Sequence, residues 1–399
     1  MIDHRELGRS LELFASDPLV GAGLPLWLPA GAAARHAVEE YIREVERCNG
    51  YRHVYSPPLA KRELYERSGH WGHFGADMFP PMALSASDEL VLRPSLCPHH
   101  ALMFAARGRS YRELPLRIAE LGGMYRAERS GVLGGLSRVR AIWLNDAHIF
   151  CAPQDASAEV ASALALMRQV HAALGVSPDS IRLSLRGPGG KYVDDPSLWS
   201  RSEEVLRAAL DGVSYVDAPG EAAFYGPKID VQIVDPAGRE WSLATVQVDF
   251  YQPERFNLSY VDGSGSRVRP VMVHRSLVGS MERLFAHLIE VHAGAFPAWY
   301  APVQAVVLPV GPAEVEPAVA FADRCMRAGL RVELVPDGSL ATRVRDAAHA
   351  KIPYAAVIGA AEAAAGAVSL RARGGAAEPA VPVADAVRSL YARAAPPAP

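Results

Sequence analysis

The sequence predicts two domains of different fold class. Residues 1–300 should form an α+β domain in which helices flank an antiparallel sheet, and residues 301–399 a small α/β domain. Alternating apolar and polar residues, interrupted by turn-forming residues, predict β-hairpins at 124–151 and 222–249. After two proline-containing pairs near residue 300, short apolar strands alternate with helices. That rhythm is typical of an α/β domain with a largely parallel sheet.

The composition is that of a globular protein, because half of the 399 residues are hydrophobic and 21% are charged. The net charge of −3 does not by itself indicate nucleic-acid binding, which would need a local basic patch. The four cysteines include no C-x-x-C pair, so neither a disulfide framework nor a zinc ribbon is expected. A charged N-terminus and the lack of a long apolar run predict a cytoplasmic protein without a membrane span.

Amphipathic periodicity predicts the helices of the first domain, at about 32–48, 154–174 and 198–211. A strand is expected over 51–57, ending at a proline pair. The first helix and this strand could form a dimer interface, but ordinary core packing is the favoured reading. Residues 61–80 are expected to form a polar loop.

The hairpin at 124–151 carries the first functional signal. Arg126, Glu128, Arg138 and Arg140 lie on its predicted strands, around a middle rich in glycine and serine. Burying these arginines in a core would cost too much solvation free energy. A guanidinium binds phosphate or carboxylate with a two-pronged fork, so a polyanion site is one interpretation. A solvated hairpin with surface salt bridges is the alternative, with about equal weight.

Two further positions are ambiguous from the residues alone. Arg283 lies one turn into a helix that begins near Ser280, where a phosphate could bind, but it could equally be a surface arginine. Cys97 lies beside His99 and His100 where a strand turns into a helix. A cysteine at such a place is more often buried and inert than a ligand.

Longer strings of residues resemble a known family. These are SGHW, LPLRIAE, SRVRA, DAHIFC, AFYGPKID, TVQVDF, PVMVHR and AGAFPAWYAPVQ. With them, the chain resembles the class II aminoacyl-tRNA synthetases over essentially its whole length, and within them the threonyl branch. The helix and strand ending at Pro57 resemble the family's motif 1, its dimerisation element. Arg126-x-Glu128 with Arg138 resembles motif 2, and GSMERLF with Arg283 resembles motif 3.

The resemblance implies a zinc ion held by Cys97, His148 and His274. Three protein ligands leave zinc an open position for substrate. Threonine can chelate zinc through its amino and hydroxyl groups, whereas valine, which lacks the hydroxyl, cannot. A hydrophobic pocket alone separates such isosteres poorly.

The resemblance also implies roles around ATP. Arg126 would bridge the amino acid carboxylate and the α-phosphate, and Glu128 would accept from the adenine amino group. Arg138 and Arg283 would hold the γ-phosphate together with Mg2+. Catalytic roles are expected for Arg126, Lys228 and Arg283, further ATP contacts for Ile142 and Gln247, and amino-acid binding for Asp146, Tyr225, Gln247 and Ser280.

The implied function is ATP-dependent activation of threonine and its transfer to the 3′ end of tRNA(Thr), by a homodimer formed through motif 1. Residues 301–399 resemble the family's anticodon-binding domain. The chain begins about where the family's catalytic domain would, so we expect no N-terminal editing domain.

Departures from the family pattern keep two other functions open. Ile142 stands where the family has phenylalanine, Leu144 replaces a glutamine, and Ser242 and Leu243 replace a Gln-Cys pair. A paralogue that activates a different amino acid for specialised metabolism would fit these changes. A non-catalytic, tRNA-binding regulatory paralogue is the third interpretation, which the retained arginines oppose.

Overall fold

The computed structural model describes residues 3–85, 88–189 and 192–399. The chain divides into two compact units. The first consists mainly of Ile42–His287 with the short segment Ser16–Pro25. The second consists of Leu288–Pro399 with Leu26–Tyr41 and the segment that ends at Ala15.

The first unit is built on an eight-stranded sheet with the order β10-β9-β11-β12-β15-β8-β7-β3. All neighbours from β9 to β7 pair antiparallel, and only the two edge strands pair parallel. The predicted antiparallel sheet is thus confirmed. Its strands are β3 (Arg52–His53), β7 (Leu116–Tyr125), β8 (Ala141–Cys151), β9 (Ser180–Leu185), β10 (Val216–Pro219), β11 (Lys228–Val234), β12 (Glu240–Asp249) and β15 (Val271–Ser276).

Both predicted hairpins are present, but one differs in detail. In the hairpin of β7 and β8 the last strand pair is Tyr125 with Ala141. Arg126, Glu128, Arg138 and Arg140 therefore lie in the connecting loop, and the prediction that placed them on the strands was wrong. The loop forms a short 3-10 turn, Ser130–Val132. Outside a strand, its polar side chains do not have to alternate between two faces.

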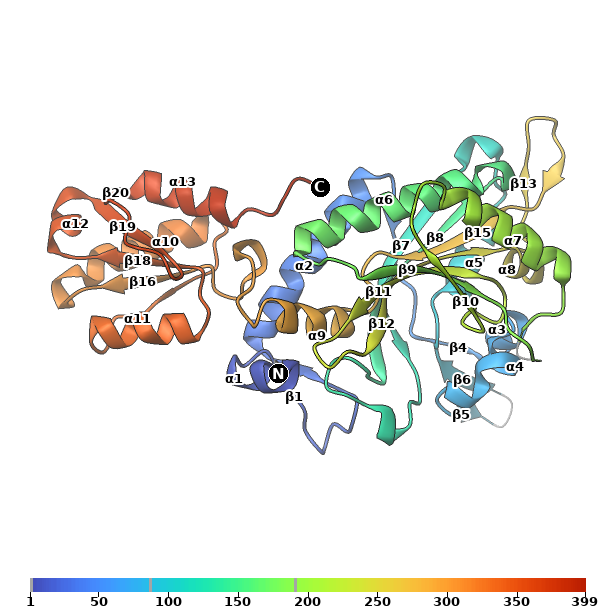
Figure 1. Cartoon of the computed structure of the whole chain (residues 1–399), viewed down its shortest axis with the longest axis horizontal. Coiled ribbons are helices and arrows are strands. Elements are labelled where there is room, and N and C mark those ends of the chain that lie inside the picture. Colours follow the sequence, from blue (N-terminus) through green and yellow to red (C-terminus); the bar gives the residue numbers. More distant parts are fainter. Residues whose placement is uncertain (1–2, 86–87, 190–191) are drawn as a thin grey trace. The chain divides into compact units, whose positions relative to one another are not determined.

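Helices cover both faces of this sheet (Figure 1). On one face lie α6 (Ala156–Leu174) and α7 (Pro196–Ala209), and α6 buries the predicted stripe that includes Val160 and Met167. On the other face lies α5 (Cys97–Ala105), whose Phe104 stacks on Phe150 of β8 at 4.6 Å between ring centroids. Because side chains alternate along a strand, His148 and Phe150 point to the face that α5 covers.

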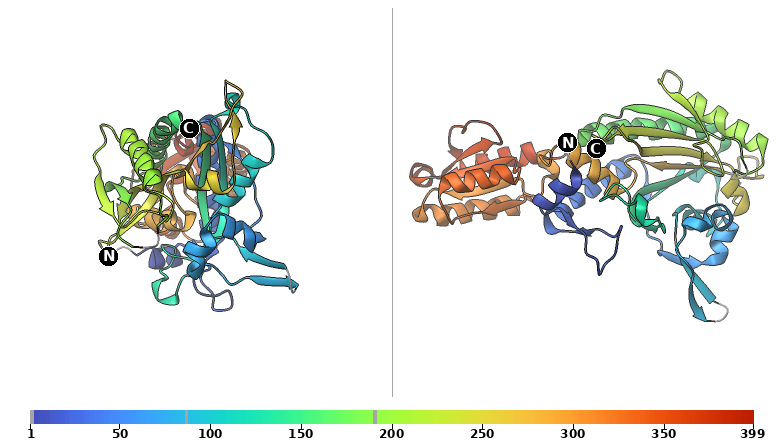
Figure 2. Two further views of the ribbon diagram at one scale, coloured as in Figure 1. Left: turned by 90° about the vertical axis from the view of Figure 1, so that its right-hand side faces the viewer. Right: turned by 60° about the horizontal axis from the view of Figure 1, so that its bottom comes forward.

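The prediction of a polar loop over residues 61–80 was wrong. The segment forms α3 (Arg62–Arg67), α4 (His70–Phe74) and a 3-10 turn, Gly75–Asp77. Tyr65 and Met78 are buried with Val91 in a small core of their own, which orders these short helices. They pack beside a three-stranded sheet of β4 (Leu59–Lys61), β5 (Met82–Ser85) and β6 (Asp88–Leu92), drawn in blue in Figure 2.

The remaining short elements extend the predictions or differ from them. The first long helix, α2 (Pro29–Cys48), begins three residues earlier than predicted, and the strand expected over 51–57 is reduced to the two residues of β3. The other elements are α1 (His4–Ser10), β1 (Phe14–Ala15), β2 (Leu26–Trp27), α8 (Tyr251–Arg255), β13 (Tyr260–Val261), β14 (Arg267–Val268) and α9 (Met281–Val291).

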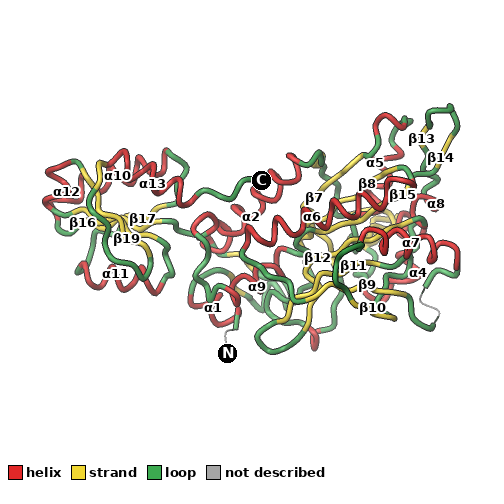
Figure 3. The backbone as a smooth tube through the Cα atoms, turned by 45° about the horizontal axis from the view of Figure 1, so that its top comes forward, coloured by secondary structure: helices red, strands yellow, loops and turns green. Residues whose placement is uncertain are grey.

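The C-terminal part of the second unit is a sheet between helices (Figure 3). Its strand order is β17-β16-β18-β19-β20. β16 pairs parallel with β17 and β18, whereas β19 and β20 are antiparallel additions. The sheet is therefore mixed and less parallel than predicted. Its elements are β16 (Ala305–Pro309), α10 (Val315–Arg327), β17 (Val332–Leu334), α11 (Leu340–His349), β18 (Tyr354–Ile358), α12 (Ala360–Ala365), β19 (Ala367–Ala372), β20 (Val381–Pro382) and α13 (Val383–Ala394).

None of the helices in the described residues combines the length and the apolar character that crossing a bilayer requires.

Candidate functional site

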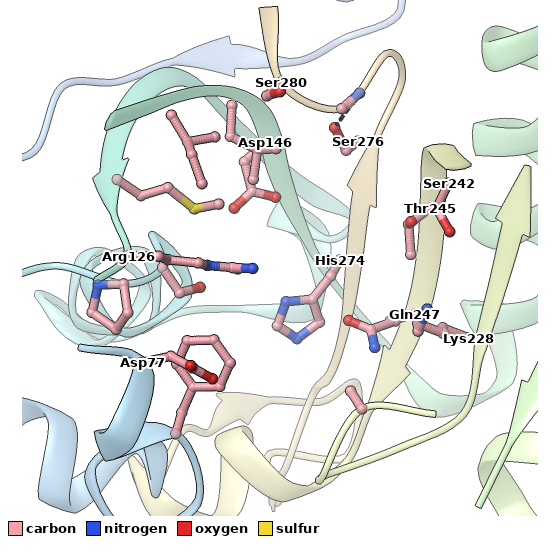
Figure 4. A pocket seen from close by; sticks show the side chains of 18 of the residues that line it. Asp77, Arg126, Asp146, Lys228, Ser242, Thr245, Gln247, His274, Ser276 and Ser280 are labelled. Atoms are coloured by element: carbon pink, nitrogen blue, oxygen red, sulfur yellow. Dashed lines mark hydrogen bonds between the residues drawn. The ribbon is translucent and has the colours of Figure 1, made fainter. Parts of the chain in front are cut away.

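A cavity of about 720 Å³ opens on the α5 face of the main sheet. β8, β12, β15, the loop between β7 and β8, and the first turn of α9 supply most of its walls. Arg126, Asp146, Gln247 and His274 project toward one common space (Figure 4). The predicted site residues that line the cavity are Arg126, Glu128, Arg138, Ile142, Asp146, Tyr225, Lys228, Gln247, His274, Ser280 and Arg283.

Cys97, His148 and His274 form a buried cluster next to this cavity, and of the three only His274 lines it. One ligand atom from each lies within 4.8 Å of the other two. The exposed fractions of Cys97 and His148 are 1% and 0%. The register of β8 and β15 pairs His148 directly with His274, so two residues 126 positions apart bring Nε2 and Nδ1 to 2.9 Å.

A further group holds each member of the cluster from outside. The Nε2 atom of His274 lies 2.8 Å from a carboxylate oxygen of Asp249, and the Nδ1 atom of His148 lies 2.7 Å from Nδ1 of His100. Gln252 donates to the sulfur of Cys97 at 3.1 Å. Burial raises the pKa of the Cys97 thiol to about 12. A nearby cation is therefore needed for the thiolate to form at neutral pH.

The donor set suits zinc. One thiolate and two imidazoles are ligands that zinc takes in tetrahedral sites with an open fourth position. A tetrahedral zinc ion with Zn–N distances of about 2.0–2.1 Å would hold its two nitrogens roughly 3.3 Å apart. The facing nitrogens of His148 and His274 are 2.9 Å apart, so a shift of a few tenths of an ångström would admit the ion.

Three arginines, Arg126, Arg138 and Arg283, line the cavity. Arg283 donates to the carbonyl oxygens of Ser137 at 3.2 Å and Ser242 at 3.0 Å. Burial, and then the charges of Arg126 and Arg138, lower the pKa of Arg283 to about 10. A guanidinium whose neighbours disfavour its charge gains from any anion placed among them.

Arg126 is the most confined of these arginines. Burial lowers the pKa of its guanidinium, which lies 5.0 Å from the centroid of the Phe74 ring. Its buried Nε atom has no hydrogen-bond partner within the parts of the chain that the structure describes. A buried donor without a partner is costly, and a ligand oxygen at this point would satisfy it.

Arg138 is already paired. Its Nη2 atom lies 2.9 Å from the carboxylate of Glu128, which is the kind of ion pair that the alternative interpretation of the hairpin predicted. Arg138 is also the most open of the three arginines, with 41% of its side chain exposed. Both residues still face the cavity, so a ligand that contacts them would exchange this pair for contacts of its own.

The turn from β15 into α9 brings backbone and side chains close together. Gly279 has φ of +66°, and a Cβ atom there would lie 2.4 Å from the carbonyl oxygen of Leu243, so only glycine fits. Ser276 accepts from the amide of Gly279 at 2.9 Å (Figure 4). The Ser280 hydroxyl accepts from the amide of Arg283 at 3.1 Å, so it caps α9 as well as lining the cavity.

The side of the cavity near the cluster is rich in paired polar groups. Tyr225 donates its hydroxyl hydrogen to Gln247 at 2.8 Å. Lys228 is paired with Asp230, which also accepts from Thr245 at 3.0 Å. Burial raises the pKa of Asp146 to about 6. These groups form a buried surface that can bind a small molecule with both donors and acceptors.

The sequence interpretation missed several residues of the site. Phe74 and Asp77 line the cavity from the segment predicted to be a loop. His70 and His73 line it too, and their spacing of three places them on one side of α4, which was the available signal. Asp249, which contacts His274, lies two residues beyond Gln247 on β12 and therefore on the same face of the sheet. This spacing of two could have indicated Asp249 from the sequence.

Comparison with known families agrees with this architecture. The family model "tRNA synthetase class II core domain (G, H, P, S and T)" matches residues 83–292, and the model "Anticodon binding domain" matches residues 304–393. The chain is 48% identical over 398 residues to a threonine–tRNA ligase of Bacillus velezensis and 49% identical over 375 residues to threonine–tRNA ligase 1 of Bacillus subtilis. These alignments cover 98% and 92% of the chain but only 62% and 58% of the relatives, so the chain spans about 60% of their length.

Solved structures agree as well. A crystal structure described as the RNA binding domain of threonyl-tRNA synthetase from Cryptosporidium parvum superposes with a TM-score of 0.94 at 34% identity, covering 99% of both chains. A putative threonyl-tRNA synthetase from Aeropyrum pernix gives a TM-score of 0.84 at 28% identity, covering 98% of this chain and 96% of that one. With a class II core that spans half of its residues and an anticodon-binding domain after it, the chain belongs to the class II aminoacyl-tRNA synthetases.

Proposed function

We propose that the chain is a threonine–tRNA ligase, which activates threonine with ATP and transfers it to the 3′ end of tRNA(Thr). The observation that carries this proposal is a cavity that brings together two chemically different groups of residues. The buried cluster of Cys97, His148 and His274 reaches the cavity through His274, and Arg126, Arg138 and Arg283 line the same cavity. The similarity to relatives named threonine–tRNA ligase supports it.

In the first step a carboxylate oxygen of threonine attacks the α-phosphorus of ATP. A new O–P bond forms, the bond to the bridging oxygen breaks, and pyrophosphate leaves. Arg126, which lines the cavity, would stabilise the charge that develops there. Arg283 and Arg138 would hold the γ-phosphate with Mg2+ sharing its charge. Lys228 also lines the cavity and would assist, and the reaction would depend mainly on positioning.

Other residues that line the cavity would make further contacts with ATP. Glu128 would accept from the adenine amino group once its pairing with Arg138 is exchanged for ligand contacts. Ile142 would pack against the adenine ring as an apolar surface, and Gln247 would contact the adenylate. Ile142 offers no aromatic face for stacking, so this end of the site would bind ATP mainly through its phosphates.

The amino acid end would hold zinc on Cys97, His148 and His274. When bound, the zinc would act as a Lewis acid that binds the amino and hydroxyl groups of threonine, with its coordination number expanding to admit both. Asp146 would accept from the amino group. Tyr225, Gln247 and Ser280 line the surrounding wall and would bind the remaining polar atoms of the amino acid.

In the second step a ribose hydroxyl at the 3′ end of the tRNA attacks the activated carbonyl, and AMP leaves. The anticodon-binding domain at 304–393 supports tRNA as the partner. We place the boundary between the catalytic and the anticodon-binding domains near residue 300. We also propose a homodimer through α2 and β3, which sedimentation velocity on the full chain tests directly.

A different amino acid substrate is the second candidate, and one observation favours it. Ile142, Leu144 and Leu243 contribute an apolar stretch to the cavity wall. Apolar side chains supply no hydrogen bonds to a polar substrate, so this wall would tolerate a more apolar amino acid. The choice between the candidates depends on the measured substrate.

Exchange of labelled pyrophosphate into ATP, measured with each amino acid in turn, tests the proposal. We expect threonine to support exchange, with valine lower in kcat/KM by about 10⁴-fold, because a site built around the hydroxyl rejects an analogue that lacks it. Exchange with another amino acid but not with threonine would favour the second candidate. No exchange with any amino acid would contradict both.

Arginine variants test the phosphate-binding end. Arg126→Gln and Arg283→Gln should each lower the threonine-dependent exchange rate by about 10²–10³-fold, because each removes charge stabilisation from the transition state. Arg129→Gln is the matched control, since Arg129 is an exposed arginine of the same loop and should leave the rate unchanged. If both test variants keep exchange rates close to wild type, neither arginine contributes to the reaction as proposed.

Metal analysis tests the other end. The purified chain should contain about one zinc per chain, and Cys97→Ala should lose it. Cys151→Ala is the control, because Cys151 is a buried cysteine of β8 outside the cluster and should retain zinc. Full zinc content in Cys97→Ala would overturn the assignment of the ligands.

A further inference from the structure

A buried polar network continues outward from the metal cluster. The Nδ1 atom of His148 lies 2.7 Å from Nδ1 of His100, and the Nε2 atom of His100 lies 3.1 Å from the carboxylate of Glu120. Glu120 is paired in turn with Arg93 at 3.1 Å. The exposed fractions of these side chains are 0% for His100, 3% for Glu120 and 2% for Arg93.

Burying such a charged network costs desolvation free energy that apolar side chains would not cost. Well-packed apolar residues of similar volume stabilise a fold as well as a buried ion pair, or better. Burial alone would raise the pKa of Glu120, but hydrogen bonds from His100 and Ser56 and the charge of Arg93 lower that pKa to about 2. The carboxylate is therefore charged in the interior, and a role beyond packing would account for it.

The two ends of the network have different surroundings. Arg93 donates to the carbonyl oxygen of Gly123 and to the hydroxyl of Ser56, so its end ties neighbouring chain segments together. The His100 end contacts His148, a member of the metal cluster. A purely structural role accounts for the first end but not for this contact.

The hydrogen-bond roles follow from the carboxylate. The ionised Glu120 can only accept, so Nε2 of His100 carries the hydrogen and, in the neutral ring, Nδ1 is an acceptor. The Nδ1 of His148 must then donate to it, which leaves the lone pair of His148 on Nε2. That atom faces Nδ1 of His274 in the cluster. Metal-ligating histidines generally have their other nitrogen held in this way.

We propose that His100 and Glu120 are positioning residues, which fix the ring of His148 in the orientation and tautomer that presents Nε2 to the metal. The inference rests on the proposed zinc site. His100 and Glu120 would hold the ring of His148 in the way that Asp249 would hold the ring of His274. The Nε2 atom of His274 lies 2.8 Å from a carboxylate oxygen of Asp249.

The test measures metal binding by the full chain without substrate. Metal-free protein is titrated with Zn2+ against a chromophoric chelator, and the visible spectrum of the Co2+ form reports the ligand geometry. The variants are Glu120→Gln, His100→Leu and His100→Asn, of which only the last keeps an acceptor near the position of Nδ1. Glu159→Gln is the matched control, because Glu159 forms a similar pair with Arg117 on the α6 face of the same sheet.

Glu120→Gln and His100→Leu should bind Zn2+ about 10–100-fold more weakly than wild type, with altered Co2+ spectra. His100→Asn should recover part of the affinity, and Glu159→Gln should bind as wild type does. If Glu120→Gln does not fold, the two His100 variants decide the matter.

Wild-type affinity and an unchanged Co2+ spectrum in both His100→Leu and Glu120→Gln would overturn the inference, even if their thermal unfolding midpoints fall, since the network would then serve stability alone. Absence of zinc binding by the wild-type chain is a different failure. It would overturn the proposed metal site, and this inference with it.

Discussion

The antiparallel register between β8 and β15 decides where the polar groups of the site meet. It pairs His148 with His274, and the register of β12 with β15 sets Gln247 beside His274. Successive side chains of a strand point to opposite faces, so a slip of one residue would turn His148 toward α6 and separate the cluster. The geometry of the candidate site therefore depends on long-range backbone pairing more than on any single side chain.

The two faces of the main sheet differ as a result. The α6 face packs apolar side chains such as Val160 and Met167, and it also carries the ion pairs Arg117–Glu159 and Arg275–Glu46. The α5 face carries a cavity, the candidate metal-ligand set and a charged network beside it.

The cavity brings groups of opposite charge preference together. Arg126 and Arg283 line it, and burial lowers the pKa of each guanidinium, so each gains from a bound anion. His274, together with Cys97 and His148, offers nitrogen and sulfur donors that suit a cation. A ligand that carries both phosphates and an amino acid would satisfy both groups together.

Local periodicity was enough to predict much of the fold. The hairpin of β11 and β12 and the buried stripe of α6 follow directly from spacings of two and of three to four residues. The segment over 61–80 was mispredicted because its helices are only five or six residues long, too short for a clear period. The loop position of Arg138 was missed because alternation continues past the end of a strand by chance.

The site was less accessible to sequence reasoning. Cys97, His148 and His274 were proposed only through a family resemblance, since residues 126 positions apart meet through strand pairing that no local pattern specifies. His100 was noted beside Cys97, but its partner Glu120 lies on β7, and their contact depends on how α5 packs on the sheet. Tertiary packing, not propensity, creates these contacts.

X-ray absorption at the zinc edge tests the central claim most directly, which is that the strand register assembles a metal site that binds the substrate amino acid. The account predicts one sulfur at about 2.3 Å and two nitrogens at about 2.0–2.1 Å. Adding threonine should add light-atom ligands, and adding valine should not reproduce the change. A spectrum without sulfur, or one that threonine leaves unaltered, would contradict the account.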